Sequence, residues 1–211
     1  MSEIILDVSA NTHKNDWEYL KKMLDKVKEL DTGKHKIIIK HQLFEKAGEN
    51  IPLDSALFYM AYYYAKEQLG YETTASVFDI PSLKVLLNYE VPFVKIANNR
   101  NLDYLIGKIP REIPVYVSCS NEKENVQLLS DHFKIVPFCC VSNYEGASVE
   151  EYEESHNPED LRYCISDHTT DWELFKKYTP RRIEVHYKLE DSTGLDAGPF
   201  ARTPAQLAEV L

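Results

Sequence analysis

The feature that most constrains this chain is a regular alternation of two kinds of segment. Eight short apolar runs rich in β-branched residues recur along its 211 residues, and each is followed by a polar residue, a turn and a helix-like stretch. Between them, residues 14–30 and 53–69 show the clearest helical spacing of apolar side chains. Strands that alternate with helices form a parallel sheet, so the pattern predicts an α/β protein. The eight runs cover residues 4–8, 36–40, 72–77, 92–97, 114–118, 134–139, 161–166 and 182–187.

The number of runs favours closure of this sheet. A doubly wound open sheet also alternates strands and helices, but its nucleotide-binding form needs a glycine-rich first turn. The first turn here reads DVSANTHKN and lacks such glycines. Eight strands, with a last helix expected at about 203–211, fit one compact (β/α)₈ TIM barrel that spans residues 1–211 as a single domain.

Composition restricts the partners of such a barrel. A formal net charge of −10 argues against nucleic acid, because phosphate backbones are bound by basic patches. No apolar run approaches the roughly 18 residues of a membrane span, and the first residues, MSEIILDV, lack the basic segment of a signal peptide. The four cysteines lack zinc-ribbon spacing, and reduced thiols are their simplest interpretation. We therefore expect a cytoplasmic protein that binds neither nucleic acid nor a membrane.

Two lysines are embedded in the apolar runs. Lys40 follows three isoleucines, and Lys95 lies between Val94 and Ile96. A lysine in such a position must either extend its ammonium group to water or meet an anion. Active sites of TIM barrels form at the carboxyl ends of the strands, where both lysines would lie. Two lysines in one barrel mouth predict a phosphate or carboxylate ligand.

Two histidines stand at the ends of neighbouring strands. His168 follows the seventh run and His186 ends the eighth. Neutral imidazoles on adjacent strands could share a divalent ion, with carboxylates such as Asp7 or Asp196 nearby. Two histidines alone do not identify a metal site, but beside the lysines they indicate a mouth that binds phosphate and metal together.

Several strings resemble the N-acetylneuraminate (sialic acid) synthase family, whose catalytic barrel condenses phosphoenolpyruvate with an N-acetylated hexose. The most specific are SDHT at 166–169 and IEVHY at 183–187. The segments DVSAN at 7–11 and GLDAGP at 194–199 are similar to relaxed forms of two further family motifs. The resemblance runs in order along nearly the whole chain, and it implies a metal-dependent transferase of carbohydrate biosynthesis that forms a carbon–carbon bond. Other matching strings are KHQ at 40–42, SVFD at 76–79, FVKIA at 93–97 and PVYVS at 114–118.

The resemblance also implies roles for individual residues. The family's two metal-binding histidines correspond to His168 and His186, and the metal is typically Mn²⁺ or Mg²⁺. The lysines that bind the phosphate and carboxylate of phosphoenolpyruvate fall on Lys40 and Lys95. Asp7 matches the first-strand glutamate of the catalytic site. The hydroxyl contacts to phosphoenolpyruvate fall on Ser76, Ser118 and Ser166. The positions that face the sugar fall on Gln42, Tyr144 and Asp196.

The chain departs from the family mainly on the sugar side. Arg100 stands where the family has a glutamate in its fourth-strand motif, Asn98 replaces a serine of that motif, and Ser142 stands where an asparagine is usual. The family's C-terminal antifreeze-like domain, which brings an arginine over the sugar, is expected to have no counterpart here. These changes predict a phosphoenolpyruvate-dependent synthase with an altered aldehyde acceptor. Arg100 would then act in catalysis in place of the missing arginine, or bind an acidic group of the acceptor, and Asn98 and Ser142 would contact that substrate.

Two other interpretations remain open. A non-catalytic barrel would bind an anion or a sugar phosphate, and the exchange at Arg100 favours it. A metal-dependent aldolase would work without phosphoenolpyruvate. A homodimer would need a surface other than the one that family members use, and a separate chain could supply a lid.

Overall fold

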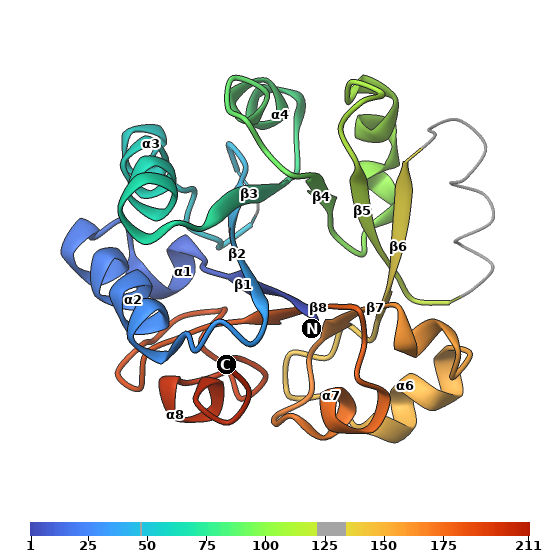
Figure 1. The fold of residues 1–211 in the computed structure, drawn as a ribbon. Helices are drawn as coiled ribbons and strands as arrows, with labels where there is room; N and C mark the ends of the chain where they lie inside the picture. Colours follow the sequence, from blue (N-terminus) through green and yellow to red (C-terminus); the bar gives the residue numbers. More distant parts are fainter. Residues whose placement is uncertain (47, 122–133) are drawn as a thin grey trace.

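Eight parallel strands form a closed barrel in the computed structural model, which describes residues 1–46, 48–121 and 134–211. Each strand pairs with the next along the chain, and β8 pairs with β1 to close the barrel (Figure 1). The predicted TIM-barrel fold is therefore confirmed. The strands are β1 (Glu3–Asp7), β2 (Lys36–Leu43), β3 (Glu72–Val77), β4 (Val94–Ile96), β5 (Val115–Cys119), β6 (Ile135–Cys140), β7 (Cys164–Asp167) and β8 (Arg182–His186).

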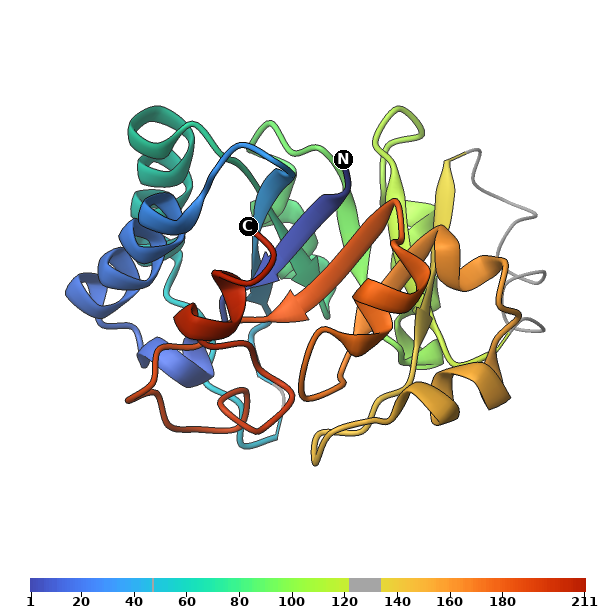
Figure 2. The ribbon, with the colours of Figure 1, turned by 60° about the horizontal axis from the view of Figure 1, so that its bottom comes forward.

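Helices surround this ring of strands on the outside (Figures 1 and 2). Most begin at a polar residue whose side chain accepts a hydrogen bond from the first turn, such as Asp16, Asp54 and Asp79. Among the described residues, no helix is long and apolar enough to cross a membrane. The helices are α1 (Ala10–His13), α2 (Trp17–Leu30), α3 (Ser55–Tyr63), η1 (Tyr64–Leu69), α4 (Ile80–Leu86), η2 (Arg100–Lys108), α6 (Val149–Ser155), η3 (Asp160–Arg162), α7 (Glu173–Tyr178) and α8 (Pro204–Leu207).

The observed elements differ from the predicted ranges where the backbone turns. Helix α2 starts three residues later than the periodicity suggests, because Lys14 and Asn15 adopt left-handed backbone angles. The predicted helix over 53–69 divides into α3 and the π-helix η1, which ends at the left-handed Gly70. Residues 161 and 162 of the seventh run belong to the 3₁₀ helix η3 (Asp160–Arg162), so β7 begins only at Cys164.

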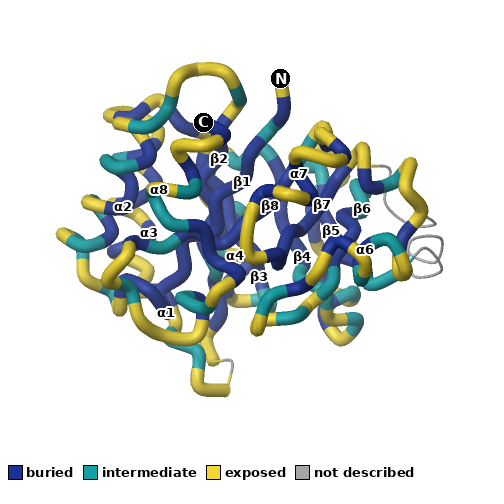
Figure 3. Tube along the Cα trace, turned by 90° about the horizontal axis from the view of Figure 1, so that it is seen from below, coloured by how far each residue is buried: buried dark blue, intermediate teal, exposed yellow. Residues whose placement is uncertain are grey.

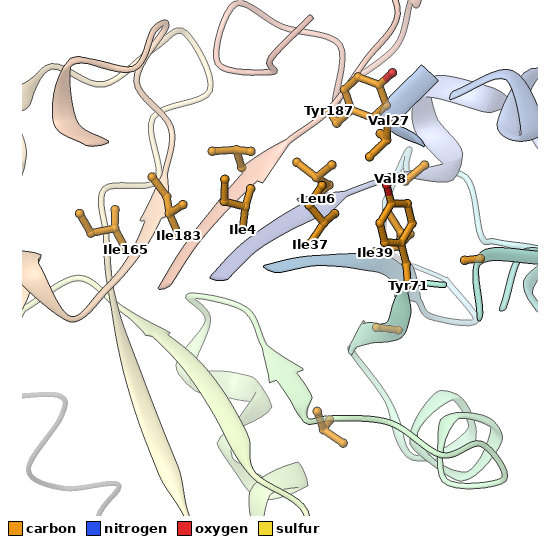
Figure 4. Packing of buried hydrophobic residues seen from close by; sticks show 14 of the residues in the cluster. Ile4, Leu6, Val8, Val27, Ile37, Ile39, Tyr71, Ile165, Ile183 and Tyr187 are labelled. Carbon is orange, nitrogen blue, oxygen red and sulfur yellow. The ribbon is translucent and has the colours of Figure 1, made fainter. Parts of the chain in front are cut away.

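Alternation along the strands separates two apolar regions. Side chains of a strand point alternately to its two faces. Ile4 and Leu6 belong to the large core between the barrel and its helices, where they share a cluster with Val27 of α2 (Figure 4). Ile5, which lies between them in sequence, belongs to a second cluster inside the barrel. Burial is accordingly concentrated on the strands, and exposed residues lie on the outer helices and loops (Figure 3).

The interior cluster closes the lower part of the barrel. The rings of Phe93 and Tyr116 stack with centroids 3.9 Å apart, and Phe138 lies against Tyr116 with centroids 5.1 Å apart. Two residues further along these strands, side chains point to the same face one layer higher. That layer contains Lys95 on β4 and Ser118 on β5. The apolar floor therefore leaves the inward-facing positions above it for polar groups. The other members of the cluster are Ile5, Ile38 and Cys164.

Candidate functional site at the barrel mouth

A pocket of about 90 Å³ opens above the apolar floor, at the carboxyl ends of the strands. This is the end of the barrel at which active sites of this fold form. Every strand, or the loop that follows it, contributes at least one side chain to its wall. The lining residues are Asp7, Lys40, Gln42, Ser76, Phe78, Lys95, Ala97, Asn98, Ser118, Cys140, Ser142, Tyr144, Ser166, His168, Glu184 and His186.

Four buried charges form the base of the pocket, and we call Asp7, Lys40, Lys95 and Glu184 the lysine layer. The ammonium group of Lys40 lies 2.7 Å from Asp7 Oδ2 and 3.2 Å from Glu184 Oε1. The other oxygen of Glu184, Oε2, lies 3.3 Å from Lys95 Nζ. Glu184 therefore bridges the two lysines, and the layer carries no net formal charge.

Hydroxyl and amide groups complete the coordination of this layer. Lys40 Nζ donates to Ser76 Oγ at 2.8 Å, and Lys95 Nζ donates to the Ser118 hydroxyl. Gln42 Nε2 donates to Asp7 Oδ2 at 2.9 Å. Among the described residues, Asp7 Oδ1 has no hydrogen-bond partner although it is buried. The layer thus retains acceptor capacity that a bound molecule or water would satisfy.

Within the layer, Lys40 and Glu184 hold each other ionised. Burial by itself would lower the pKa of Lys40, but the carboxylates of Asp7 and Glu184 outweigh it and raise that pKa above its usual value. Burial would likewise raise the pKa of Glu184, yet Lys40 and Lys95 hold it at about 2. Lys40 can therefore meet an anion as a cation.

Two imidazoles stand above the layer, and we call His168 and His186 the histidine rim. Their ring centroids lie 5.4 Å apart, and both residues are buried. His186 Nδ1 lies 3.5 Å from Asp196 Oδ1 and 3.7 Å from Asp7 Oδ2. It has no hydrogen-bond partner within the described part of the chain. An orphaned ring nitrogen between two carboxylates is a donor set suited to a cation.

Burial lowers the pKa of both histidines, although Asp167 opposes it at His168 and Asp7 opposes it at His186. The imidazoles are therefore neutral at neutral pH, which is the form that ligates metals. Within residues 1–46, 48–121 and 134–211, no three potential ligands are gathered as a ready-made metal site. The rim fits a divalent ion held by two imidazoles, with substrate or water oxygens completing its coordination.

A loop after β8 approaches the rim through Asp196. Asn11, after β1, donates to Asp196 Oδ2 at 2.6 Å and to Asn50 Oδ1 at 2.8 Å. Gly194 has a φ of 117°, and a Cβ there would lie 2.1 Å from the Asn11 carbonyl oxygen. Asn11 thus joins the loops after β1, β2 and β8, and this junction turns the other oxygen of Asp196 towards His186.

On the β4–β6 side of the mouth, the described lining residues other than Lys95 are uncharged. Asn98 Nδ2 donates to Ser142 Oγ at 3.0 Å and to Ser120 Oγ at 2.7 Å. Tyr144 is 52 % exposed, and its ring centroid lies 5.4 Å from that of His168. These side chains form a hydrogen-bonding wall with an aromatic edge, which suits a polyhydroxylated molecule.

The structure brings together all of the predicted site residues except two. Arg100 lies outside the pocket lining: its Nη2 donates to the Ser118 carbonyl oxygen at 2.7 Å, and its Nη1 lies 3.5 Å from Asp103 Oδ1. Asp196 also lies outside the lining, but it reaches the rim through His186. Arg100 is therefore placed behind the wall that holds Ser118.

Four lining residues were assigned no role in the site by the sequence analysis: Phe78, Ala97, Cys140 and Glu184. Glu184 is the most important of them, and it carried a signal like that of the embedded lysines. It stands between Ile183 and Val185 in a buried run, two residues before His186. Period-two alternation would also have placed Cys140 on the inward face with Phe138.

Three solved structures share this architecture. N-acetylneuraminic acid (sialic acid) synthetase from Leptospira borgpetersenii, in complex with citrate, has a TM-score of 0.75 and 20 % identity, covering 98 % of this chain and 80 % of that one. A protein E of spore coat polysaccharide biosynthesis from Chromobacterium violaceum has a TM-score of 0.77 and 15 % identity, covering 99 % and 72 %. Phospho-2-dehydro-3-deoxyheptonate aldolase (DAHP synthase) from Thermotoga maritima has a TM-score of 0.65 and 13 % identity, covering 99 % and 67 %.

The similarity to known proteins is much weaker in sequence than in structure. No protein-family model matches it, and no curated protein matches its sequence. At 20 % identity and below, the likeness establishes the fold, and in this respect the predicted resemblance to a sialic acid synthase barrel is confirmed. The chain is thus a closed (β/α)₈ barrel of the architecture found in sialic acid synthetase and DAHP synthase.

Proposed function

We propose that this protein condenses phosphoenolpyruvate with the aldehyde of a sugar, in the manner of a sialic acid synthase, and releases phosphate. The observation that carries the proposal is the lysine layer beneath the histidine rim in one pocket. Two buried lysines suit the phosphate and carboxylate of phosphoenolpyruvate. Two neutral imidazoles beside them suit a divalent ion that would meet the aldehyde.

The charge of the pocket supports joint binding of anion and metal. The formal charges of the lysine layer sum to zero, and the two histidines of the rim are neutral. Phosphoenolpyruvate carries a carboxylate and a phosphate, or about 2.5 to 3 negative charges at neutral pH. A divalent ion at His168 and His186 would offset most of that charge in a buried site. Phosphoenolpyruvate is therefore expected to bind more tightly when Mn²⁺ is present.

The reaction can be written with all atoms in balance. C3 of phosphoenolpyruvate forms a bond to the aldehyde carbon, whose oxygen takes up a proton and becomes a hydroxyl. Positive charge develops at C2, water adds there, and the C–O bond to phosphate breaks. Of the two protons that the water loses, one replaces the proton taken up by the aldehyde oxygen and the other leaves with phosphate. The products are a 2-keto acid longer by three carbons and inorganic phosphate.

The residues of the layer have separate tasks in this scheme. Lys40 and Lys95 hold the anion so that C3 faces the rim, and Ser76 and Ser118 orient the two ammonium groups. Asp7 and Glu184 would stabilise positive charge at C2, and Asp7 would accept a proton from the attacking water. When bound at the rim, the divalent ion supplies Lewis-acid polarisation of the aldehyde.

The direct test incubates the protein with Mn²⁺, phosphoenolpyruvate and a panel of aldoses that includes N-acetylmannosamine. Phosphate is measured by a colorimetric assay and the product by mass spectrometry. We expect phosphate release that depends on both acceptor and metal and disappears in Lys95→Met. The matched control is Lys36→Met, at the opposite end of the barrel, which should keep full activity.

The same assay separates the alternatives. Turnover of pyruvate with an aldehyde and no phosphate release would identify a metal-dependent aldolase. Binding of phosphoenolpyruvate with no turnover of any acceptor would favour the non-catalytic barrel. The position of Arg100 behind Ser118 is compatible with catalysis, because the residue does not line the pocket.

A further inference from the structure

Arg202 is a fully buried arginine in the loop between β8 and α8, outside the pocket. Its Nη2 lies 2.8 Å from Asp167 Oδ2 and 3.0 Å from Thr169 Oγ1. It also donates to the backbone carbonyls of Thr169, Asp171 and Phe200. The guanidinium group therefore binds the whole turn that follows β7.

The backbone of Arg202 is joined to the end of β8. Its N–H donates to the His186 carbonyl oxygen at 2.7 Å, and its own carbonyl accepts from the Lys188 N–H at 3.0 Å. The neighbouring Tyr187 forms a parallel bridge with Arg202. One residue thus holds His186 through its main chain and the turn containing His168 through its side chain.

The aromatic surroundings fix the guanidinium itself. It lies over the ring of Trp172, 5.0 Å from the centroid, and the Trp172 indole donates to the Gln206 carbonyl oxygen at 2.7 Å. Asp167 uses both oxygens, since Oδ1 accepts from the Thr169 N–H at 2.7 Å while Oδ2 accepts from Arg202. The turn after β7 is consequently locked to the segment after β8.

From this arrangement we infer that Arg202 is the positioning residue of the histidine rim: it sets the distance and orientation of His168 relative to His186, and thereby the affinity of the pair for a divalent ion. The inference rests on the proposed function for the use of that ion. Arg202 touches neither the pocket nor any reacting group, so its effect passes through the two histidines.

The physical reason is the shape of the arginine fork. A guanidinium group presents its donors in a rigid plane and can bind a carboxylate and several carbonyls at once. A lysine in its place would keep the ion pair with Asp167 but could not satisfy all of the turn carbonyls. Metal affinity depends on ligands being held in place before the ion arrives, and loss of such support typically weakens it 10- to 100-fold.

The test measures Co²⁺ binding to the full chain by isothermal titration and by its visible absorption spectrum, which reports ligand geometry. We expect Arg202→Lys to remain folded, to bind Co²⁺ at least 10-fold more weakly and to show an altered spectrum. The matched control is Lys176→Ala, which removes the exposed 3.0 Å pair between Lys176 of α7 and Glu209, in the turn after α8. This control should bind Co²⁺ as the wild type does.

A second variant tests the same inference if Arg202→Lys does not fold. Asp167→Asn has one acceptor oxygen where two are used, so it must lose either the Thr169 or the Arg202 contact. We expect an affinity loss of about threefold or more. Wild-type affinity and spectrum in Asp167→Asn or in a folded Arg202→Lys would overturn the inference, as would failure of the wild type to bind Co²⁺. A wild type that binds Co²⁺ but never releases phosphate would refute the proposed function alone.

Discussion

The lysine layer and the histidine rim lie one above the other in the same pocket, but they are held in opposite ways. In the layer every charge faces an opposite charge, and Glu184 bridges Lys40 and Lys95. In the rim the groups are neutral, and His186 Nδ1 has no hydrogen-bond partner among the described residues. The charges of the layer are therefore paired without a ligand, whereas the rim leaves a ring nitrogen open to one.

The difference follows from what surrounds each level. The layer lies inside the barrel, where an unpaired charge would be costly, and strands that face one another across the barrel supply its partners. The rim lies at the strand ends, where the loops after β6, β7 and β8 decide what approaches it. Stability should therefore depend more on the layer, and ligand binding more on the rim. Four predictions test this contrast.

The largest effect is expected when the layer loses a cation. Lys40→Met leaves Asp7 and Glu184 without their shared partner, which should cost about 3–5 kcal/mol in the free energy of unfolding. Urea denaturation at pH 7 measures this. The control, Lys36→Met on the same strand, removes a lysine that is 48 % exposed and should cost less than about 1 kcal/mol. Equal losses in the two variants would show that the layer has no special role in stability.

For the histidine rim we expect the reverse: a mutation should weaken metal binding strongly and change stability little. His186→Ala removes one of two expected ligands, and we expect Mn²⁺ affinity to fall about a hundredfold, or about 2.7 kcal/mol. The free energy of unfolding should change little in comparison with Lys40→Met, because His186 Nδ1 has no hydrogen-bond partner in the described part of the chain. Calorimetric titration of Mn²⁺ measures the affinity, with His35→Ala, far from the mouth, as control. Undiminished Mn²⁺ binding in His186→Ala would remove the rim as a metal site.

As the pH falls, protonation of buried neutral histidines should destabilise the protein before protonation of Glu184 in the lysine layer does. Burial lowers the pKa of His13 to about 4 and that of His41 to about 3. These two histidines are buried between the barrel and its helices, and their ring nitrogens lack hydrogen-bond partners among the described residues. The unfolded chain, with a histidine pKa of about 6.5, binds protons more readily than the folded protein. Their contribution to stability is therefore complete above about pH 6.5 and declines as the pH falls towards 4.

Between pH 7 and pH 5, each of these histidines should lower the free energy of unfolding by about 2 kcal/mol. The ion pairs of Glu184, whose pKa is about 2, should begin to lose stability only below about pH 4.5. Urea denaturation across this range tests the order of events. His41→Leu should reduce the decline by about 2 kcal/mol, and an unaltered decline in that variant would assign the acid sensitivity to other groups.

The smallest effect is expected at the aromatic edge of the rim. Tyr144 lies beside His168 and against Phe200, with ring centroids 4.9 Å apart in the latter pair, yet it is half-exposed. Tyr144→Ala should raise KM for the aldehyde acceptor about threefold, which corresponds to less than about 1 kcal/mol of binding free energy. The Mn²⁺ affinity should remain unchanged. Tyr59→Ala, at a similarly exposed tyrosine on α3, is the control. A loss of metal binding in Tyr144→Ala would show that the ring supports the histidines rather than the acceptor.

Much of this arrangement was determined by the sequence itself. Beyond the residue roles that the family resemblance implied, the eight alternating runs predicted the barrel, and the strand ends identified the two lysines and two histidines at its mouth. Both are local properties, because alternation with a period of two fixes which side chains share a face of a strand. Lys40 and Lys95 were recognised because a cation within an apolar run needs a partner. The same argument applies to Glu184, since its run is equally apolar.

The tertiary structure decided which groups meet. Glu184 reaches both lysines only because the closed barrel brings β8 beside β1 and turns the inward faces of β2, β4 and β8 towards one another. Arg100 appears from the sequence to face the substrate, but the turn after β4 directs it to the Ser118 carbonyl. Arg202 carries no signal in its own segment, and its role arises because two loops pack together. Charge pairing and loop contacts depend on distances between segments far apart in the chain, which no local pattern encodes.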